Sequence, residues 1–216
     1  MDKAQRYRQE QSEMTVRRLL QQFARYPEPG KVKTRLQTQL SAEESCAVHE
    51  SLLLRTARTL VQAELGDQEL WLDRAGEHST LSSALGMGMA GPYLQRGGDL
   101  GERMYASLHE GLGRAEAVVL VGSDCPVLSR DYLLAAFQSL ERADVVLGPA
   151  EDGGFVLIGC TSVHEDMFAG VSWGGDEVLE TTRANFERLG LADAYLATLY
   201  DVDSPDDLRR WRREQS

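Results

Sequence analysis

The fold is decided by the stretch Ala117-Val118-Val119-Leu120-Val121, which runs on into Gly122-Ser123-Asp124-Cys125-Pro126. Five apolar residues in succession are typical of a strand buried on both faces, as in parallel sheets covered by helices. The turn behind it places Asp124 at the carboxyl end of that strand, where open α/β sheets bind their ligands. This stretch predicts a central strand with a candidate chemical group directly after it.

On both sides of this strand, strand-like and helix-like segments alternate. Apolar residues recur at spacings of three and four between Ser41 and Glu64, and Ser41 with Glu44 is a capping-box signature. Further helices are expected at 79–85, from Asp99 onward, and at 130–141, 177–189 and 205–213. Strands are expected at 17–24, 69–72, 92–95, 143–147, 155–159 and 194–199. The pattern predicts a three-layer α/β/α fold with a mainly parallel, mixed sheet.

The length of 216 residues suits one domain, which we place at 17–216 behind a polar N-terminal extension at 1–16. With 23 Lys and Arg against 34 Asp and Glu, the net charge is −11. Such a surface repels polyanions, so a nucleic acid polymer is not expected as a partner. A local basic cluster can still hold the phosphates of one nucleotide.

The three cysteines, Cys46, Cys125 and Cys160, are far apart and form no disulfide framework or zinc spacing. No apolar stretch approaches the roughly 20 residues of a membrane helix, and the polar start does not resemble a signal peptide. A reducing, cytoplasmic location without membrane attachment is therefore expected. A homodimer remains compatible with the sequence.

The loop after the first strand is the strongest candidate site. Arg25, Lys31, Lys33 and Arg35 place four cations within eleven residues of an acidic chain. Pro29 stiffens the loop, Gly30 allows a ligand close approach to the backbone, and Thr34 lies near an expected helix start. Arg and Lys together suit a polyphosphate, although a solvated basic loop is the alternative. The Gly-x-x-x-x-Gly-Lys-Ser/Thr pattern of a P-loop is absent.

Three carboxylates are candidates for a metal site. Asp124, next to Ser123, is placed to bind Mg²⁺ (or Mn²⁺) that bridges phosphates, or else to cap the following helix. Asp201 and Asp203 lie two apart before the last helix, so an extended segment would point them the same way. Asp203, with Asp201 as a further candidate, would complete the site with Asp124.

Two other segments carry candidate groups. Asp152-Gly153-Gly154 predicts a turn, and its functional interpretation is that Asp152 holds a sugar or acceptor hydroxyl while the glycines make room. Asp99 is either a helix cap or, with Arg103, part of a phosphate site. The histidines have no metal-ligand spacing, and His49 is expected to pack within its helix.

Five blocks together resemble a bacterial group of glycosyltransferase-A-like proteins, associated with radical-SAM and selenoprotein-type gene clusters. The blocks keep that group's order and fall within residues 17–211; they are 23–36, 98–104, 122–126, 148–154 and 201–208. Segment 168–178 is similar as well and contains Trp173, but Gly174-Gly175 stands where the group has Ser-Thr. This departure weakens the transfer of acceptor-site details, including Trp173.

The resemblance implies a nucleotide-diphospho-sugar transferase fold, with the first loop on the nucleotide, Asp124 on Mg²⁺ and Asp203 as the late second ligand. The expected activity is metal-dependent glycosyl transfer from a nucleotide-sugar to a small-molecule acceptor. In this scheme Lys33, Arg35, Asp124 and Asp152 are the catalytic residues. The alternatives are nucleotidyl transfer from an NTP to a phosphorylated or alcohol acceptor, and a non-catalytic nucleotide-binding protein.

Overall fold

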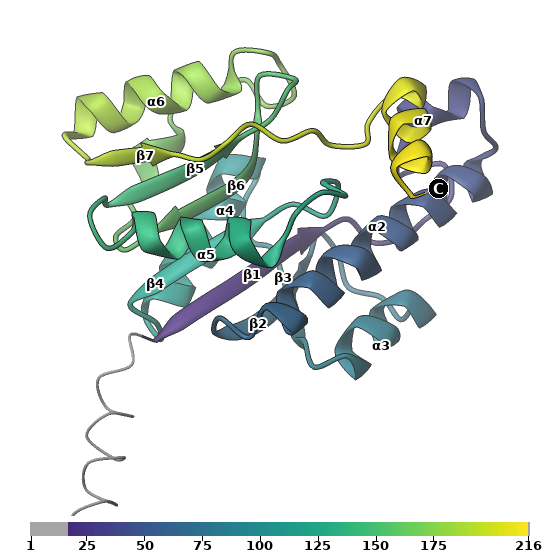
Figure 1. Ribbon diagram of the computed structural model, residues 1–216, viewed down its shortest axis with the longest axis horizontal. Coiled ribbons are helices and arrows are strands. Elements are labelled where there is room, and N and C mark those ends of the chain that lie inside the picture. Colours follow the sequence, from purple (N-terminus) through teal and green to yellow (C-terminus); the bar gives the residue numbers. More distant parts are fainter. Residues whose placement is uncertain (1–16, 216) are drawn as a thin grey trace, which may run out of the picture.

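The computed structural model describes residues 17–215, so the expected extension at 1–16 lies outside the described residues. The chain forms a seven-stranded sheet in the order β3-β2-β1-β4-β6-β5-β7 (Figure 1). The strands are β1 (Arg18–Ala24), β2 (Asp67–Leu72), β3 (Ala90–Leu94), β4 (Ala117–Val121), β5 (Val145–Pro149), β6 (Phe155–Cys160) and β7 (Asp193–Tyr195).

The sheet is mixed because β6 runs against its two neighbours, β4 and β5. The pairs β1–β2, β1–β4, β2–β3 and β5–β7 are all parallel. The reversal is made by the turn at 150–154, where Gly154 N donates to Asp152 Oδ1 at 2.9 Å. The expected turn and the mainly parallel sheet are confirmed.

Helices cover both faces of the sheet, which gives the three predicted layers. They are α2 (Ala42–Ala63), α3 (Ser79–Gly86), α4 (Leu100–Leu112), α5 (Arg130–Ser139), α6 (Val178–Leu189) and α7 (Pro205–Glu214), with 3-10 helices η1 (Thr34–Thr38) and η2 (Glu165–Phe168). Helices α2, α3 and α5 pack on one face, and α4, α6 and η2 pack on the other. Figure 1 shows α2 and α5 in front of the sheet and α4 behind it.

Strand β4 explains why an unbroken apolar run was needed at the centre. Val119 and Val121 enter the core with α2, α3 and α5, while Val118 and Leu120 enter the core with α4, α6 and η2. All five residues of the strand are buried. The alternation of side chains along a strand thus serves two cores at once.

A third, smaller core brings the C-terminal segment to the end of β4. Leu36, Leu52, Val202, Leu208 and Trp211 pack together there, which places α7 against α2 and η1. Figure 1 shows α7 beside α2, at the opposite side of the view from β7. The backbone N–H of Val202 donates to the carbonyl of Asp124 at 2.9 Å. The carboxylates on either side of Val202 therefore lie beside Asp124.

The element boundaries differ from expectation at the sheet edges. The last strand ends at Tyr195, and Leu199 adds only an isolated bridge to Ala150. Strand β3 begins at Ala90, two residues before the strand expected at 92–95. Edge strands have only one neighbour, so their limits depend on tertiary pairing more than on local pattern. No helix within residues 17–215 has the length and apolar character required to cross a bilayer.

Candidate functional site

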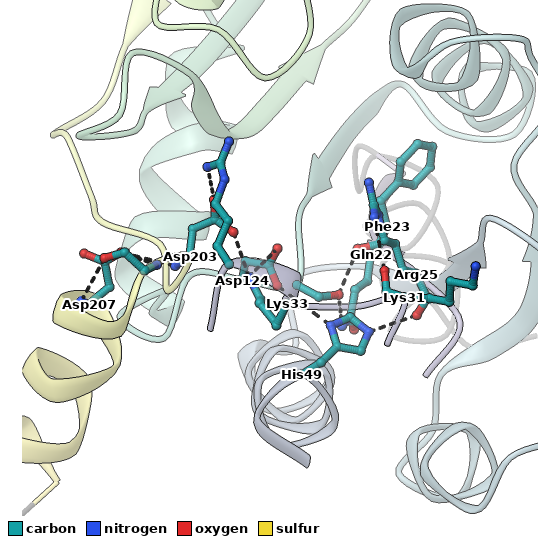
Figure 2. A network of polar contacts seen from close by, with 12 residues as sticks. Gln22, Phe23, Arg25, Lys31, Lys33, His49, Asp124, Asp203 and Asp207 are labelled. Carbon is teal, nitrogen blue, oxygen red and sulfur yellow. Dashed lines mark hydrogen bonds and ion pairs between the residues drawn. The ribbon is translucent and has the colours of Figure 1, made fainter. Parts of the chain in front are cut away.

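The basic loop and the central strand meet through Lys33. Its ammonium lies 2.9 Å from Asp124 Oδ2 and 3.8 Å from Asp203 Oδ1. Only 4% of the Lys33 side chain is exposed, and its backbone adopts φ 47°, which is uncommon for a residue other than glycine. These contacts join the carboxyl ends of β1 and β4 to the segment before α7. Figure 2 shows Lys33 and Asp124 at the centre of this network.

The rest of the loop is open to solvent. Pro29 and Gly30 are the middle residues of a turn closed by Lys31 N donating to Glu28 O at 3.0 Å, and Gly30 has φ 80°. A Pro-Gly pair with glycine at positive φ is what a type II turn requires. The Arg25, Lys31 and Thr34 side chains are exposed beside this turn. The loop therefore presents cations around an exposed backbone.

Arg35 is the most exposed cation of the network, with 67% of its side chain accessible, and it forms an ion pair with Asp203. The predicted helix start is present, since Lys33 is the N-terminal cap of η1. However, η1 is a 3-10 helix of five residues, too short to give a helix dipole that binds phosphate. The side-chain charges, rather than the helix, give this segment its positive character.

Asp124 is held ionised by its neighbours. Burial acts to raise the pKa of this carboxyl, but Lys33, His49 and Arg25 outweigh it and hold the pKa below its ordinary value. Although 43% of the side chain is exposed, Oδ1 is buried and accepts no hydrogen bond from residues 17–215. His49 Nδ1 lies 4.0 Å from this oxygen.

His49 was expected to pack within its helix. The structure shows that it also contacts the loop and faces Asp124. Its Nε2 lies 2.9 Å from the carbonyl oxygen of Arg25, which fixes Nε2–H as the donor, and Nδ1 faces Asp124 (Figure 2). The side chain is 4% exposed. The signal in the sequence was the place of His49 on the buried stripe of α2, because a buried polar ring needs a hydrogen-bond partner.

Asp201 and Asp203 flank Val202 as alternation predicts. Val202 is fully buried, whereas both aspartates are half-buried. Asp203 pairs with Lys33 and Arg35, while Asp201 lines a cavity next to Asp124 and Asp152. Burial and the charge of Asp152 raise the pKa of Asp201 to about 6, with further contributions from Asp124 and Asp203. The negative charge around Asp201 is thus only partly balanced.

This cavity, of about 230 Å³, lies beside Asp124 on the face covered by α4. Asp152, Gly154 and Trp173, all predicted for an acceptor or sugar, line it. Most of the remaining wall is apolar, including Phe23, Leu100, Met104 and Phe155. Sequence reasoning missed these apolar residues because their spacing is that of ordinary core positions.

Two glycines shape the cavity wall. A Cβ on Gly153, which has φ 88°, would lie 2.1 Å from the backbone oxygen of Asp176. Gly153 therefore lets the backbone of Asp176 approach closely. On α4, a Cβ on Gly101 would lie 2.9 Å from Trp173. Its absence lets the indole pack against the start of that helix.

Asp99, Arg103 and Ser123, the other residues considered for phosphate binding, each form hydrogen bonds within the protein. Asp99 caps α4, accepting from Glu102 N at 2.8 Å, and Arg103 Nε donates to Gly97 O at 3.2 Å. The Ser123 hydroxyl is buried, donating to Phe23 O at 2.8 Å and accepting from Gln22 Nε2. The capping interpretation of Asp99 is confirmed, and Ser123 connects β4 to β1.

The residues present suit a hard cation only in part. Among the described residues, no three His, Cys, Asp or Glu side chains are grouped closely enough to hold a metal ion. Asp124 nevertheless offers a buried, unpartnered carboxylate oxygen, and oxygen is the ligand that Mg²⁺ prefers. Asp203 is engaged by Lys33 and Arg35, so its carboxylate is available only if one of those contacts is exchanged.

Comparison with known families identifies the family of this chain. Residues 56–175 match the family described as "Uncharacterized protein conserved in bacteria (DUF2064)". The chain belongs to this family. No curated protein matches this member of it.

Solved structures agree on the fold. A Desulfovibrio desulfuricans G20 protein, provisionally assigned as a nucleotide-diphospho-sugar transferase, is 28% identical with a TM-score of 0.82, covering 94% of this chain and 89% of its own. CMP:2-keto-3-deoxy-manno-octonic acid synthetase with CTP is 11% identical at TM-score 0.58, covering 92% and 98%. Glucosyl-3-phosphoglycerate synthase from Mycobacterium tuberculosis, with Mg²⁺ and UDP, is 13% identical at TM-score 0.56, covering 96% and 79%.

These neighbours are nucleotide-using transferases, and the chain has their fold. The predicted nucleotide-diphospho-sugar transferase fold is confirmed. The more distant likenesses extend to the fold alone, because their identities are low.

Proposed function

We propose that this protein is a metal-dependent transferase with a nucleotide donor, and that residues 25–35 bind the donor's phosphates. The observation that carries this proposal is the ion pair between buried Lys33 and Asp124, which joins the basic loop to the end of the central strand. Burial of the Lys33 ammonium costs desolvation free energy, so the position of this pair at the ligand-binding edge of the sheet favours a functional role.

The loop supplies charges of two kinds. Arg25, Lys31 and Arg35 are exposed and can approach phosphate, Arg with a planar fork and Lys as a point charge, and Arg35 would exchange its ion pair with Asp203 to do so. Lys33 has three N–H donors, of which Asp124 takes one at 2.9 Å. Its remaining donors and its charge can stabilise the charge that develops on a transferred or leaving phosphate.

Asp124 would hold Mg²⁺ or Mn²⁺, with Asp203 or Asp201 as the second carboxylate. The free Oδ1 of Asp124 supports this assignment, as does the Mg²⁺ and UDP complex of the M. tuberculosis neighbour. When bound, the metal would neutralise the phosphate charge of the donor. His49 would keep the Asp124 carboxylate oriented through its contact with the Arg25 carbonyl.

The favoured reaction is glycosyl transfer. The acceptor hydroxyl or amine loses a proton and bonds to the sugar's anomeric carbon, while the bond from that carbon to the diphosphate breaks. The alternative is nucleotidyl transfer, in which the acceptor bonds to the α-phosphorus and pyrophosphate leaves. CMP:2-keto-3-deoxy-manno-octonic acid synthetase, with CTP, supports keeping this second reaction. A non-catalytic nucleotide-binding role would be contradicted by turnover of any donor.

Arg35→Ala tests the phosphate assignment without disturbing the core. The side chain is 67% exposed, so the variant should keep its melting temperature but bind a nucleotide diphosphate or NTP about tenfold more weakly. Loss of one charged hydrogen bond, worth about 1.5 kcal/mol, accounts for that factor. Titration calorimetry with UDP, CTP and other nucleotides, with and without Mg²⁺, measures it.

Arg17→Ala is the matched control, because Arg17 is 69% exposed and lies at the opposite end of β1. A parallel Asp124→Asn variant should lose the Mg²⁺ dependence of nucleotide binding while keeping the shape of the side chain. Equal weakening by Arg35→Ala and Arg17→Ala, or an unchanged Mg²⁺ dependence in Asp124→Asn, would contradict the proposal. The preferred base, and the effect of an attached sugar, then distinguish the two reactions.

A further inference from the structure

The cavity beside Asp124 has a wall that is apolar and partly aromatic. Phe23, Leu100, Met104, Phe155 and Trp173 line it, together with the end of β4. At about 230 Å³ it is slightly below the range of about 300–1,000 Å³ that is usual for ligand sites. A small molecule with an apolar, ring-sized body would fit it, because such a body gains most from leaving water for this wall.

The charged groups at the cavity are all acidic. Asp124, Asp152 and Asp201 line the cavity. Among the residues between 17 and 215, no Lys, Arg or His lines it. Lys33 balances Asp124 at 2.9 Å. Asp152 and Asp201 have no ion-pair partner in the described chain.

The cationic side chains of the loop are absent from the cavity lining. Arg25, Lys31 and Arg35 are exposed, and none of them lines the cavity. An anion placed in the cavity would therefore meet Asp152 and Asp201, which no cationic side chain of the lining balances, at a cost of like-charge repulsion in a partly desolvated site. A phosphate or carboxylate is consequently directed to the loop and away from the cavity.

We propose that the cavity binds the second substrate, and that this acceptor is a non-anionic small molecule with an apolar body and an amine or hydroxyl end. The proposal rests on the function proposed above, since it assigns the acceptor of that reaction. The apolar body lies against Trp173 and Phe155, and the amine or hydroxyl end faces Asp152 and Asp201. The donor is thereby directed to the basic loop and the acceptor to the acidic cavity.

A matched probe series tests the charge preference. 2-Phenylethylamine, 2-phenylethanol and 3-phenylpropionate share a ring and differ mainly in a cationic, neutral or anionic end. Titrated into the full-length protein, the amine and the alcohol should each bind at least tenfold more tightly than the carboxylate. The preference of the amine over the alcohol should shrink as salt is raised, because salt screens its attraction to the carboxylates.

Variants locate the binding. Trp173→Ala should weaken the amine and the alcohol about tenfold, and Leu100→Ala, at a 41% exposed position, should do so about threefold without risk to folding. Asp152→Asn should weaken the amine about threefold and leave the alcohol unchanged, since its Oδ1 can still accept from Gly154 N. Leu94→Ala is the control, an exposed apolar position on β3 outside the cavity.

Nucleotide binding is measured on the same samples, so failure of the proposed function appears there and not in the probe titrations. The inference is overturned if the carboxylate binds within threefold of the amine and the alcohol. It is also overturned if no probe binds, or if Trp173→Ala and Leu100→Ala change binding no more than Leu94→Ala. Selective binding of the amine and alcohol, lost in the cavity variants, establishes it.

Discussion

At the scale of single residues, the site has few cationic side chains to balance its carboxylates. Lys33 alone lies between Asp124 and Asp203, at 2.9 and 3.8 Å from their carboxylate oxygens. Its positive φ is held by these contacts, because the left-handed region costs free energy for a side chain with a Cβ. The charge of Lys33 stabilises the ionised form of Asp201 only in part, so the pKa of Asp201 stays above its ordinary value.

Asp201→Asn should therefore change stability with a defined pH dependence. The pKa of Asp201 is raised from 3.8 to about 6 in the folded protein, chiefly by burial and by Asp152. The folded state binds this proton more tightly than the unfolded chain, so the stabilisation is full below about pH 4 and is lost as the pH rises through about 6. The variant does not ionise, and above pH 6 it should exceed the wild type by about 2 kcal/mol, allowing for solvent screening.

Urea unfolding without divalent metal, at pH values between 4 and 8, measures the difference. Asp131→Asn, an exposed carboxyl on α5, is the control for removing a charge. A difference between Asp201→Asn and wild type that stays constant over this pH range would show that Asp201 is not perturbed.

At the scale of elements, the start of α7 caps the last helix and also positions part of the site. Ser204 caps the helix, and the Asp207 carboxylate accepts from Ser204 N at 2.7 Å and from Asp203 N at 3.3 Å. Figure 2 shows Asp207 and Asp203 at one end of the network that reaches Asp124. A helix cap here also sets where the Asp203 carboxylate lies.

Ser204→Ala and Ser41→Ala should therefore separate stability from binding. Both serines cap a helix through a reciprocal capping box, so each substitution should cost about 1 kcal/mol of unfolding free energy. Only Ser204 adjoins Asp203, so only Ser204→Ala should also weaken Mg²⁺-dependent nucleotide binding. Thermal melts and nucleotide titrations of both variants measure this. Equal binding by the two variants would mean that the cap does not position Asp203.

At the scale of the whole molecule, charge is distributed unevenly. The chain carries a net charge of −11, yet the loop at 25–35 gathers four cations at the carboxyl edge of the sheet. The cavity beside this loop is lined by the carboxylates of Asp124, Asp152 and Asp201. A small polyanion can reach the loop, whereas a long one would also meet the acidic surface.

The protein should therefore bind a nucleotide but not duplex DNA. In fluorescence anisotropy with a labelled duplex of about 20 base pairs, no saturable binding is expected at about 0.15 M salt. Even at about 0.05 M salt, where non-specific DNA binding strengthens, the net charge should prevent it. A duplex that competes with a bound nucleotide would show that the basic loop extends into a wider cationic surface.

The sequence by itself determined the layers and the order of elements. The run at 117–121 required burial on both faces, and capping signals at Ser41 and Asp99 located helix starts that the structure confirms. These features are local: a strand's alternation and a cap's hydrogen bonds involve residues a few positions apart. The grouping of candidate residues at strand ends followed from the same local order.

Only the tertiary structure decided which of those residues meet. Lys33 turned inward to Asp124 and Asp203, and His49 on α2 came to face Asp124, because packing around Leu36 and Val202 joins segments distant in sequence. The cavity beside them is likewise made by side chains from several elements, whose spacing along the chain matches ordinary core. Contacts between distant segments depend on how whole faces pack, and no local pattern encodes them.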